Sequence, residues 1–162
     1  MGHTRWKTSV TVAAIVERDG RYLLVEEHTA DGLMLNNPAG HLDPGETPLD
    51  GVIRETLEET GRRFTPQALL GVYLSRARRA ETGADVTYVR LAFVGEVGEP
   101  LPDHTLDAEI VRTLWLTPEE LRAQARRHRS PLLMRCVDDH RSGRRHPLEL
   151  VFSDPSVNAP AP

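Results

Sequence analysis

The sequence predicts an α+β or mixed α/β fold, with helices lying outside a sheet whose strands are mostly antiparallel neighbours. Three observations support this fold class. Apolar residues alternate with other residues in several segments, turn signals separate neighbouring segments of this kind, and helix-capping residues mark three helix starts. The elements follow the order strands, one helix, strands, two helices, which indicates helices packed against a sheet within one domain.

Alternating apolar residues and turn signals predict the strands. Thr8–Val16 alternates, and Arg21–Glu27 follows the turn signal Asp19-Gly20, so we expect a hairpin. Leu33–Leu42 contains a proline and a glycine and is expected to be a loop with a fragment of strand. The remaining expected strands are Leu69–Arg78, Val86–Val97 after a turn at Thr82-Gly83, and Ile110–Leu116.

Capping residues mark the helices. Thr47-Pro48-Leu49-Asp50 supplies an N-cap, a proline at the first helical position and an acid three residues after the cap. This helix should run to Thr60 and end at Gly61. Two further helices are expected, one from Thr117-Pro118-Glu119-Glu120 to about Arg127 and one from Ser130-Pro131 to about Ser142.

The first of these helices has an acidic face. Glu55, Glu58 and Glu59 lie at helical spacing, so three carboxylates converge within one turn. Such a face is either solvated or compensated by a cation, and carboxylates suit magnesium, manganese or calcium. The apolar positions at i, i+3, i+4 and i+8 are expected to form the buried stripe, namely Leu49, Val52, Ile53 and Leu57.

Composition excludes several classes of protein. The chain has 162 residues and a net charge of −4, which argues against a general binder of duplex DNA. Its apolar runs are too short to span a bilayer, and residues 1–7 lack the apolar stretch of a signal peptide. The single cysteine, Cys136, cannot form an internal disulfide. We therefore expect a cytoplasmic protein without membrane association, with one domain over residues 1–152 and a flexible tail over 153–162.

The loop before the acidic helix supports a ligand site. Pro38–Glu46 is rich in glycine and proline and leads into the helix N-terminus, where the backbone can approach an anion closely. Arg54 directly precedes the acids and can pair with Glu46.

Gly40, Glu46 and the segment Arg54–Gly61 together resemble the Nudix box. In that pattern a glycine, five residues, a glutamate and seven residues precede Arg-Glu-x-x-Glu-Glu-x-Gly, and every glycine and charged position is filled here. The sequence departs at two apolar positions, Thr56 and Arg62. Neither residue belongs to the metal chemistry of the pattern, so local packing is what these departures affect.

The likeness extends to the NudJ phosphatase branch of the Nudix family over about residues 8–151. The resemblance implies a Nudix α/β/α sandwich with a mixed, curved sheet, and Mg²⁺, or Mn²⁺ as a substitute. It further implies hydrolysis of a pyrophosphate linkage in nucleoside tri- and diphosphates or in thiamine-pathway pyrophosphates. Alternatives are hydrolysis of another nucleoside diphosphate compound such as ADP-ribose, and a non-catalytic nucleotide sensor. The segments that match are Val25-Glu26-Glu27, Asn36–Leu42, Leu114–Leu116, Arg129–Leu132 and Pro147–Glu149.

The resemblance also implies roles for the box residues. Glu55 and Glu59 are expected to bind the metal, and their i, i+4 spacing agrees with this. Glu58 is either a third ligand or the group that deprotonates water, and the backbone carbonyl of Gly40 is expected to complete the coordination. The residues expected in the catalytic machinery are Glu46, Arg54, Glu55 and Glu58, of which Glu46 and Arg54 form a supporting ion pair.

Other residues have two interpretations each. Arg90 either reaches the substrate phosphate or forms a structural ion pair, and Glu109 is either an acid for the metal or water or a surface acid. Leu35 stands where the NudJ branch often has an aromatic residue, so it either borders the substrate or faces the core. Glu26 and Glu27 are either near the cleft or solvated. The expected partner is a small-molecule substrate, and the chain is expected to be a monomer or homodimer.

Overall fold

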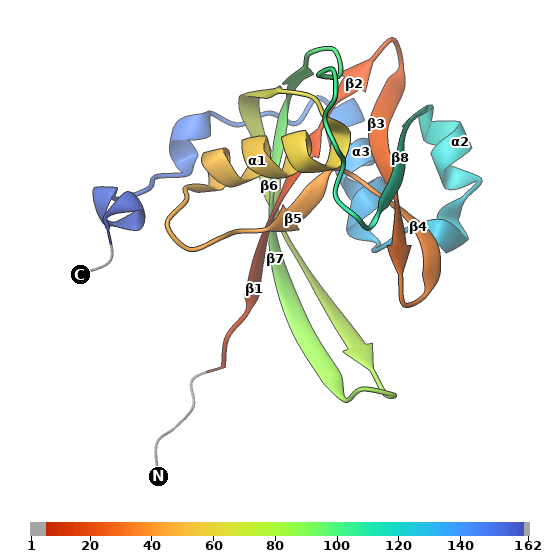
Figure 1. Ribbon diagram of the computed structural model, residues 1–162, viewed down its shortest axis with the longest axis horizontal. Helices are drawn as coiled ribbons and strands as arrows, with labels where there is room; N and C mark the ends of the chain where they lie inside the picture. The colour runs from red at the N-terminus through yellow and green to blue at the C-terminus, as the bar shows by residue number, and fades with distance from the viewer. Residues whose placement is uncertain (1–5, 161–162) are drawn as a thin grey trace.

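The computed structural model describes residues 6–160 and has two sheets with helices packed on both sides (Figure 1). The mixed α+β architecture expected from the sequence is confirmed. Most of the segment scanned for a signal peptide, and the last two residues of the expected tail, lie outside the described residues. Within residues 6–160, no helix combines the length and the apolar character that crossing a membrane requires.

The first sheet is mixed. Its strands run in the order β5-β1-β7-β6, with β1 parallel to β7 and the other pairs antiparallel. Past the start of β1 at Ser9, β6 and β7 continue as a two-stranded ribbon that projects from the body (Figure 1). The strands are β1 (Ser9–Ile15), β5 (Ala39–His41), β6 (Phe64–Arg79) and β7 (Ala84–Val97).

The second sheet is antiparallel, and β3 pairs with each of the other strands. Asp19 and Gly20 both have positive φ, 51° and 76°, which is the backbone of the tight turn expected between the first two apolar runs. The region expected to be mostly loop instead contributes one strand to each sheet. The strands of the second sheet are β2 (Glu17–Arg18), β3 (Arg21–Thr29), β4 (Gly32–Asn36) and β8 (Ile110–Leu116).

Helix α1 (Pro48–Thr60) begins and ends as its caps predict. The Thr47 side chain and Asp50 form a reciprocal capping box, and Gly61 ends the helix with φ at 67°. The expected buried stripe is wrong at Ile53, which is 38% exposed. The helix instead turns Val52 inward together with part of its acidic face, because that face borders a cavity rather than solvent.

The two departures from the box pattern are accommodated locally. Thr56 is fully buried, and its hydroxyl donates to the Val52 carbonyl oxygen at 2.7 Å, so the polar atom is satisfied within the helix. The Arg62 guanidinium lies 5.8 Å from the centre of the Trp115 ring and donates to the Gly98 carbonyl oxygen at 2.9 Å.

Two apolar cores lie on opposite faces of the first sheet. One joins the sheet to α3 through Leu133 and Cys136, and the other joins it to α1 through Val52. The second expected helix ends early, at Arg122, and a short 3-10 turn follows it. The remaining helices and turns are α2 (Pro118–Arg122), η1 (Ala125–Arg127), α3 (Leu132–Arg141), η2 (Leu148–Leu150) and η3 (Pro155–Asn158), the last within the expected tail.

Candidate active site

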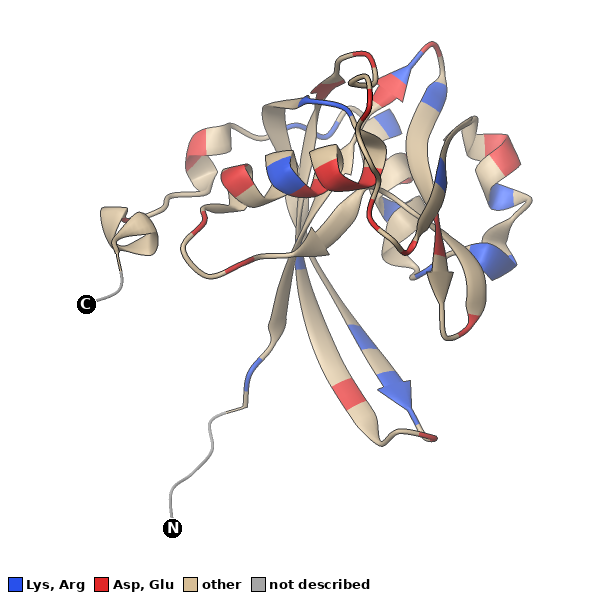
Figure 2. Cartoon of the chain, viewed as in Figure 1, with Lys and Arg blue, Asp and Glu red and all other residues tan. Residues whose placement is uncertain are grey.

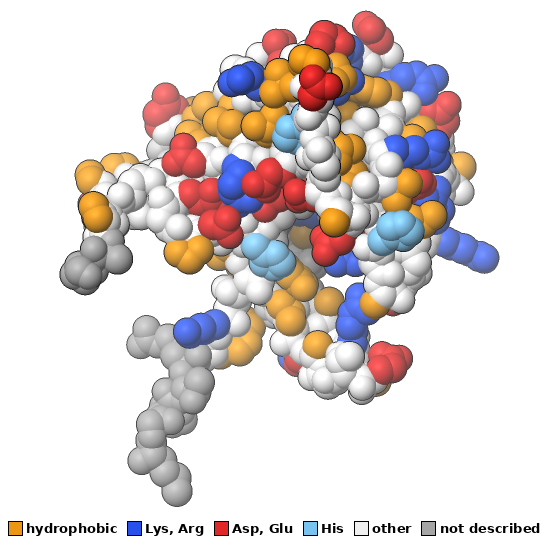
Figure 3. All heavy atoms as spheres, viewed as in Figure 1, with side chains coloured by type: hydrophobic (Ala, Val, Ile, Leu, Met, Phe, Trp, Pro, Cys, Tyr) orange, Lys and Arg blue, Asp and Glu red, His pale blue; other side chains and the backbone are white. Residues whose placement is uncertain are grey.

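A cavity of about 650 Å³ opens between α1, β5, the β6–β7 ribbon and the start of α3. This volume falls within the range of about 300–1,000 Å³ that is usual for small-molecule sites. Acidic side chains from α1 line the cavity, as does Arg90 from β7. Figure 2 shows the acidic positions along α1, and Figure 3 shows acidic and basic side chains gathered over this helix.

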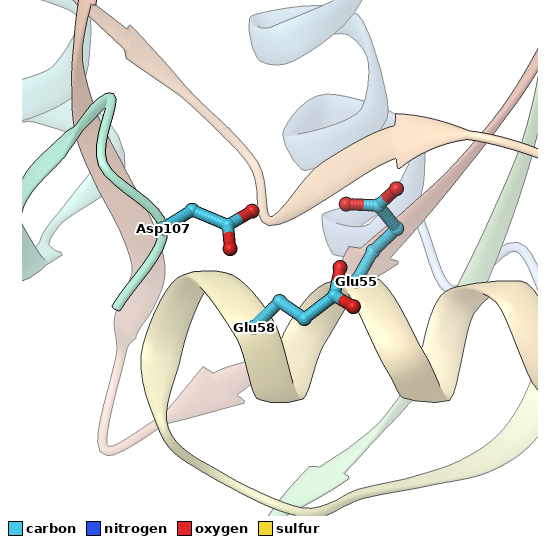
Figure 4. A group of neighbouring side chains, drawn as sticks. All are labelled: Glu55, Glu58 and Asp107. Carbon is cyan, nitrogen blue, oxygen red and sulfur yellow. The ribbon is translucent and has the colours of Figure 1, made fainter. Parts of the chain in front are cut away.

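Three carboxylates meet beside this cavity, and two of them, Glu55 and Asp107, line it. Glu55 and Glu58 project from α1, and Asp107 comes from the loop before β8 (Figure 4). One oxygen of each lies within 4.8 Å of the others, and we call these three residues the carboxylate cluster. The Asp107 backbone N–H donates to the Glu58 carbonyl oxygen at 3.1 Å, which fixes this loop against the end of α1.

The sequence analysis did not select Asp107. It expected Glu109, two residues further on, as the acid from this segment. Glu109 is exposed and lines the cavity, but it is not part of the carboxylate cluster. The structure places Asp107 and not Glu109 beside Glu55 and Glu58, and no local pattern of a polar loop distinguishes one acid from another.

Arg54 compensates the acids around it. Its Nε and Nη2 donate to the two oxygens of Glu46 at 2.9 and 2.6 Å, which is the ion pair expected from the sequence. Its Nη1 donates to Glu55 Oε1 at 2.9 Å and to Glu58 Oε2 at 3.0 Å. Hydrogen bonding to Arg54 holds the pKa of Glu46 below its ordinary value.

Gly40 allows β5 to pass directly over the cluster. A Cβ at this position would lie 2.0 Å from the carboxyl carbon of Glu55, so any other residue would displace that side chain. Gly40 also lines the cavity. The glycine at this position of the box is thus required by the close approach of the backbone to Glu55.

Glu59 is the most deeply buried acid of α1. Its side chain points toward β5, where Oε2 accepts a hydrogen bond from the Ala39 N–H at 2.9 Å. Burial raises the pKa of Glu59 to about 9, with a smaller contribution from the neighbouring charge of Glu55. Glu59 lines the same cavity but lies outside the carboxylate cluster.

The donor set fits a hard divalent cation. Burial raises the pKa of Glu55 as well as that of Glu59, so both carboxyls need added positive charge to be fully ionised. Carboxylate oxygens are the ligands that Mg²⁺, Mn²⁺ and Ca²⁺ prefer. The cluster and Glu59 together therefore provide an acidic site that a divalent cation would complete.

Arg90 is 94% buried, as its exposed fraction is 6%. Its guanidinium donates to the side-chain oxygens of Asn37 at 3.1 Å and Asn36 at 3.2 Å. Within residues 6–160 no carboxylate lies within 4 Å of it, so the expected structural ion pair is not formed. Its guanidinium therefore lies at the wall of the cavity without a salt bridge to any described carboxylate.

Leu35 does not border the cavity. Its side chain is fully buried in the core that also contains Leu133, and it is not among the cavity residues. Alternation along β4 explains this, since Leu35 pairs with Glu26 and faces α3, whereas Asn36 faces the cavity. The expectation that Leu35 contacts substrate is therefore wrong, and its alternative, a core position, holds.

Comparisons with known proteins agree with this geometry. A NUDIX domain model matches residues 6–136. The chain is 34% identical over 146 residues to Phosphatase NudJ of Escherichia coli strain K12, covering 90% of this chain and 92% of that protein. A solved NUDIX hydrolase from Nitrosomonas europaea is 44% identical, with a TM-score of 0.83, covering 91% of this chain and 98% of the other.

A more distant structure shares the fold alone. A UDP-X diphosphatase is 17% identical, with a TM-score of 0.68, covering 88% of this chain and 67% of the other. The domain match, the long alignment to NudJ phosphatases and the intact box around Arg54 point to the same conclusion. The chain belongs to the NUDIX hydrolase family, enzymes that act on phosphoric anhydride bonds.

Proposed function

We propose that this enzyme releases phosphate from nucleoside tri- and diphosphates or from pyrophosphorylated thiamine-pathway compounds, as a NudJ-like phosphatase. The observation that carries the proposal is the carboxylate cluster of Glu55, Glu58 and Asp107, of which Glu55 and Asp107 line one cavity together with Arg90. Hydrolysis of an anionic anhydride requires acids that can hold a metal ion and a positively charged side chain that can hold a phosphate. The similarity to NudJ phosphatases supports the substrate class.

We assign Mg²⁺ to this site, with Mn²⁺ as a substitute. Glu55, Glu59 and Asp107 would hold the ion, together with the backbone of Gly40, and Glu58 is either a further ligand or the group that deprotonates water. A bound divalent cation supplies neutralisation of the phosphate charge and a more acidic water.

The arginines of the site orient the acidic side chains and neutralise negative charge. Arg54 holds Glu55 and Glu58 in fixed orientations, since one of its nitrogens donates to both. Arg54 occupies Glu58 Oε2, so the other oxygen, Oε1, is left either to bind the ion or to accept the proton of the attacking water. Arg90 binds phosphate oxygens, held in place by Asn36 and Asn37.

Two other functions remain as alternatives, namely hydrolysis of an ADP-ribose-type compound and non-catalytic sensing of a nucleotide. A sensor has no need of the box carboxylates, and all four are present as Glu46, Glu55, Glu58 and Glu59. We further propose a cytoplasmic location, a monomer or homodimer, and no duplex nucleic acid or membrane partner.

The proposal is tested, with Mg²⁺ and with EDTA, by phosphate release from nucleoside tri- and diphosphates and a thiamine-pathway pyrophosphate, and by AMP release from ADP-ribose. We expect turnover of the mono-nucleotide and thiamine-type substrates only with Mg²⁺, and turnover lower by about a hundredfold or more with the Glu55→Gln variant. Turnover of ADP-ribose alone would support the first alternative. Binding without hydrolysis of any member, at saturating Mg²⁺, would support the sensor.

A further inference from the structure

Two carboxylates that line the cavity, Glu27 and Glu109, take no part in the assignments above, and of these Glu109 is exposed. Glu27 lies near the end of β3, and its side chain is 14% exposed. It lines the same cavity as the acids of α1. Its Oε1 is buried and has no hydrogen-bond partner within residues 6–160, and the nearest cation, Arg129 Nε, lies 3.6 Å away.

The preceding residue shows that this arrangement is specific to Glu27. Glu26 is more deeply buried, with a side chain 6% exposed, and Arg112 donates to one of its oxygens at 3.0 Å and Arg127 to the other. The two acids point to opposite faces of β3, because side chains alternate along a strand. Arginines thus satisfy the acid that faces away from the cavity, while the acid that faces the cavity keeps an oxygen free.

An unused buried acceptor is unfavourable for the folded protein and calls for an explanation. Desolvation by burial raises the pKa of Glu27 in spite of the charges of Arg129 and Arg90 and a hydrogen bond from the Asn36 side chain, which agrees with a carboxyl that is satisfied only in part. Within the described residues Glu27 is not one of the carboxylate cluster. A ligand that donates a hydrogen bond would satisfy it.

The charge of the substrate decides which part of it Glu27 can meet. An ionised carboxylate only accepts hydrogen bonds, and it repels phosphate groups. The phosphates are assigned to Arg90 and the cation site, so the organic part of the substrate is what remains for Glu27. The neutral Asn36 side chain lies between the Arg90 end and the Glu27 end of the cavity. It accepts a hydrogen bond from Arg90 and lines the same cavity.

We propose that Glu27 determines specificity by accepting a hydrogen bond from an amino group on the nitrogen heterocycle of the substrate. The inference rests on the proposed function, because it assigns the organic part of the same pyrophosphate substrate. A site that holds a buried acceptor discriminates against a ring with a carbonyl oxygen at that position, because two acceptors then face each other. Glu27 is in this sense a specificity residue and not part of the hydrolytic machinery.

The test compares matched pairs of substrates that differ in an amino or an oxo group, namely CDP with UDP and ADP with IDP. We expect kcat/KM of the wild-type enzyme to favour the amino member of at least one pair by about tenfold or more. In Glu27→Gln this preference should fall to within about threefold, because an amide both donates and accepts. The matched control is Glu96→Gln, which changes an exposed acid on a different strand, β7, and should keep the wild-type ratio.

The outcomes distinguish a failure of this inference from a failure of the proposed function. Absence of hydrolysis of all four nucleotides by the wild-type enzyme with Mg²⁺ would count against the proposed function. Hydrolysis of both members of each pair at similar kcat/KM, or an unchanged preference in Glu27→Gln, would overturn the inference alone. A Glu27→Gln change confined to the Mg²⁺ concentration at half-maximal rate would likewise overturn it. If Glu27→Gln does not fold, Glu27→Asp, which withdraws the acceptor by one methylene, should show the same loss of preference.

Discussion

Replacing Glu59 with glutamine is expected to remove most of the pH dependence of stability of the metal-free protein. The native state holds the proton of this buried carboxyl up to a pKa of about 9, whereas the unfolded chain releases it near the ordinary value of 4.5. The native state therefore binds more protons than the unfolded state between these limits, and the free energy of unfolding falls as pH rises through them. The contribution of the protonated Glu59 to stability is fully present below about pH 4.5 and is lost progressively toward pH 9.

The size of the effect follows from the linkage slope. One proton difference changes the free energy of unfolding by about 1.4 kcal/mol per pH unit. Between pH 5 and pH 7 the metal-free wild type should therefore lose about 3 kcal/mol, a large share of the roughly 5–15 kcal/mol typical of a folded domain. The glutamine side chain keeps an oxygen for the Ala39 N–H and has no charge to desolvate.

Urea unfolding in EDTA at a series of pH values measures this directly. We expect the Glu59→Gln curve to be nearly flat where the wild-type curve falls, and saturating Mg²⁺ to reduce the wild-type slope. Glu96→Gln, an exposed acid on β7, should follow the wild type. Parallel pH curves for wild type and Glu59→Gln would refute the reasoning.

Three further predictions concern the site and its surroundings. Glu55→Gln should lower kcat about a hundredfold or more at saturating Mg²⁺, since one positioned charge is worth a factor of this order, and near-normal steady-state turnover would contradict its assignment. Arg54→Met leaves the carboxylate of Glu46, both of whose oxygens Arg54 binds, without a counterion. It should lower the free energy of unfolding by about 2–4 kcal/mol in urea titrations, and an unchanged midpoint would show that the network is dispensable. Leu35→Trp should overpack the core and destabilise by about 1–3 kcal/mol in thermal unfolding, without lowering KM, whereas a lower KM at unchanged stability would return Leu35 to the substrate site.

Local chemistry made part of this fold predictable. Thr47, Pro48 and Gly61 act on atoms within a few residues of themselves, so the start and end of α1 could be inferred from the sequence. The tight turn at Asp19-Gly20 is similarly local. The β6 strand begins earlier than expected, at Phe64, because register shifts near Pro66 and Gly71 interrupt its alternation.

The site was predictable where its residues belong to one helix. The spacing of Glu55, Glu58 and Arg54 along α1 already brings them together, whereas Asp107 reaches the cluster only through a loop that packs against the helix end. Ile53 was misassigned because periodicity shows that a helix has an apolar stripe but not which neighbour covers it.

Binding of Mn²⁺ to wild type and Asp107→Asn, followed by the electron paramagnetic resonance signal of the free ion, tests the central claim most directly. Asp103→Asn, an exposed acid of the same loop, is the matched control, and phosphate release is measured on the same samples. If the carboxylate cluster holds the cation that supports hydrolysis, Asp107→Asn should weaken Mn²⁺ binding about tenfold or more and lower turnover in parallel, while Asp103→Asn changes neither. Wild-type Mn²⁺ affinity and turnover in Asp107→Asn would contradict the account.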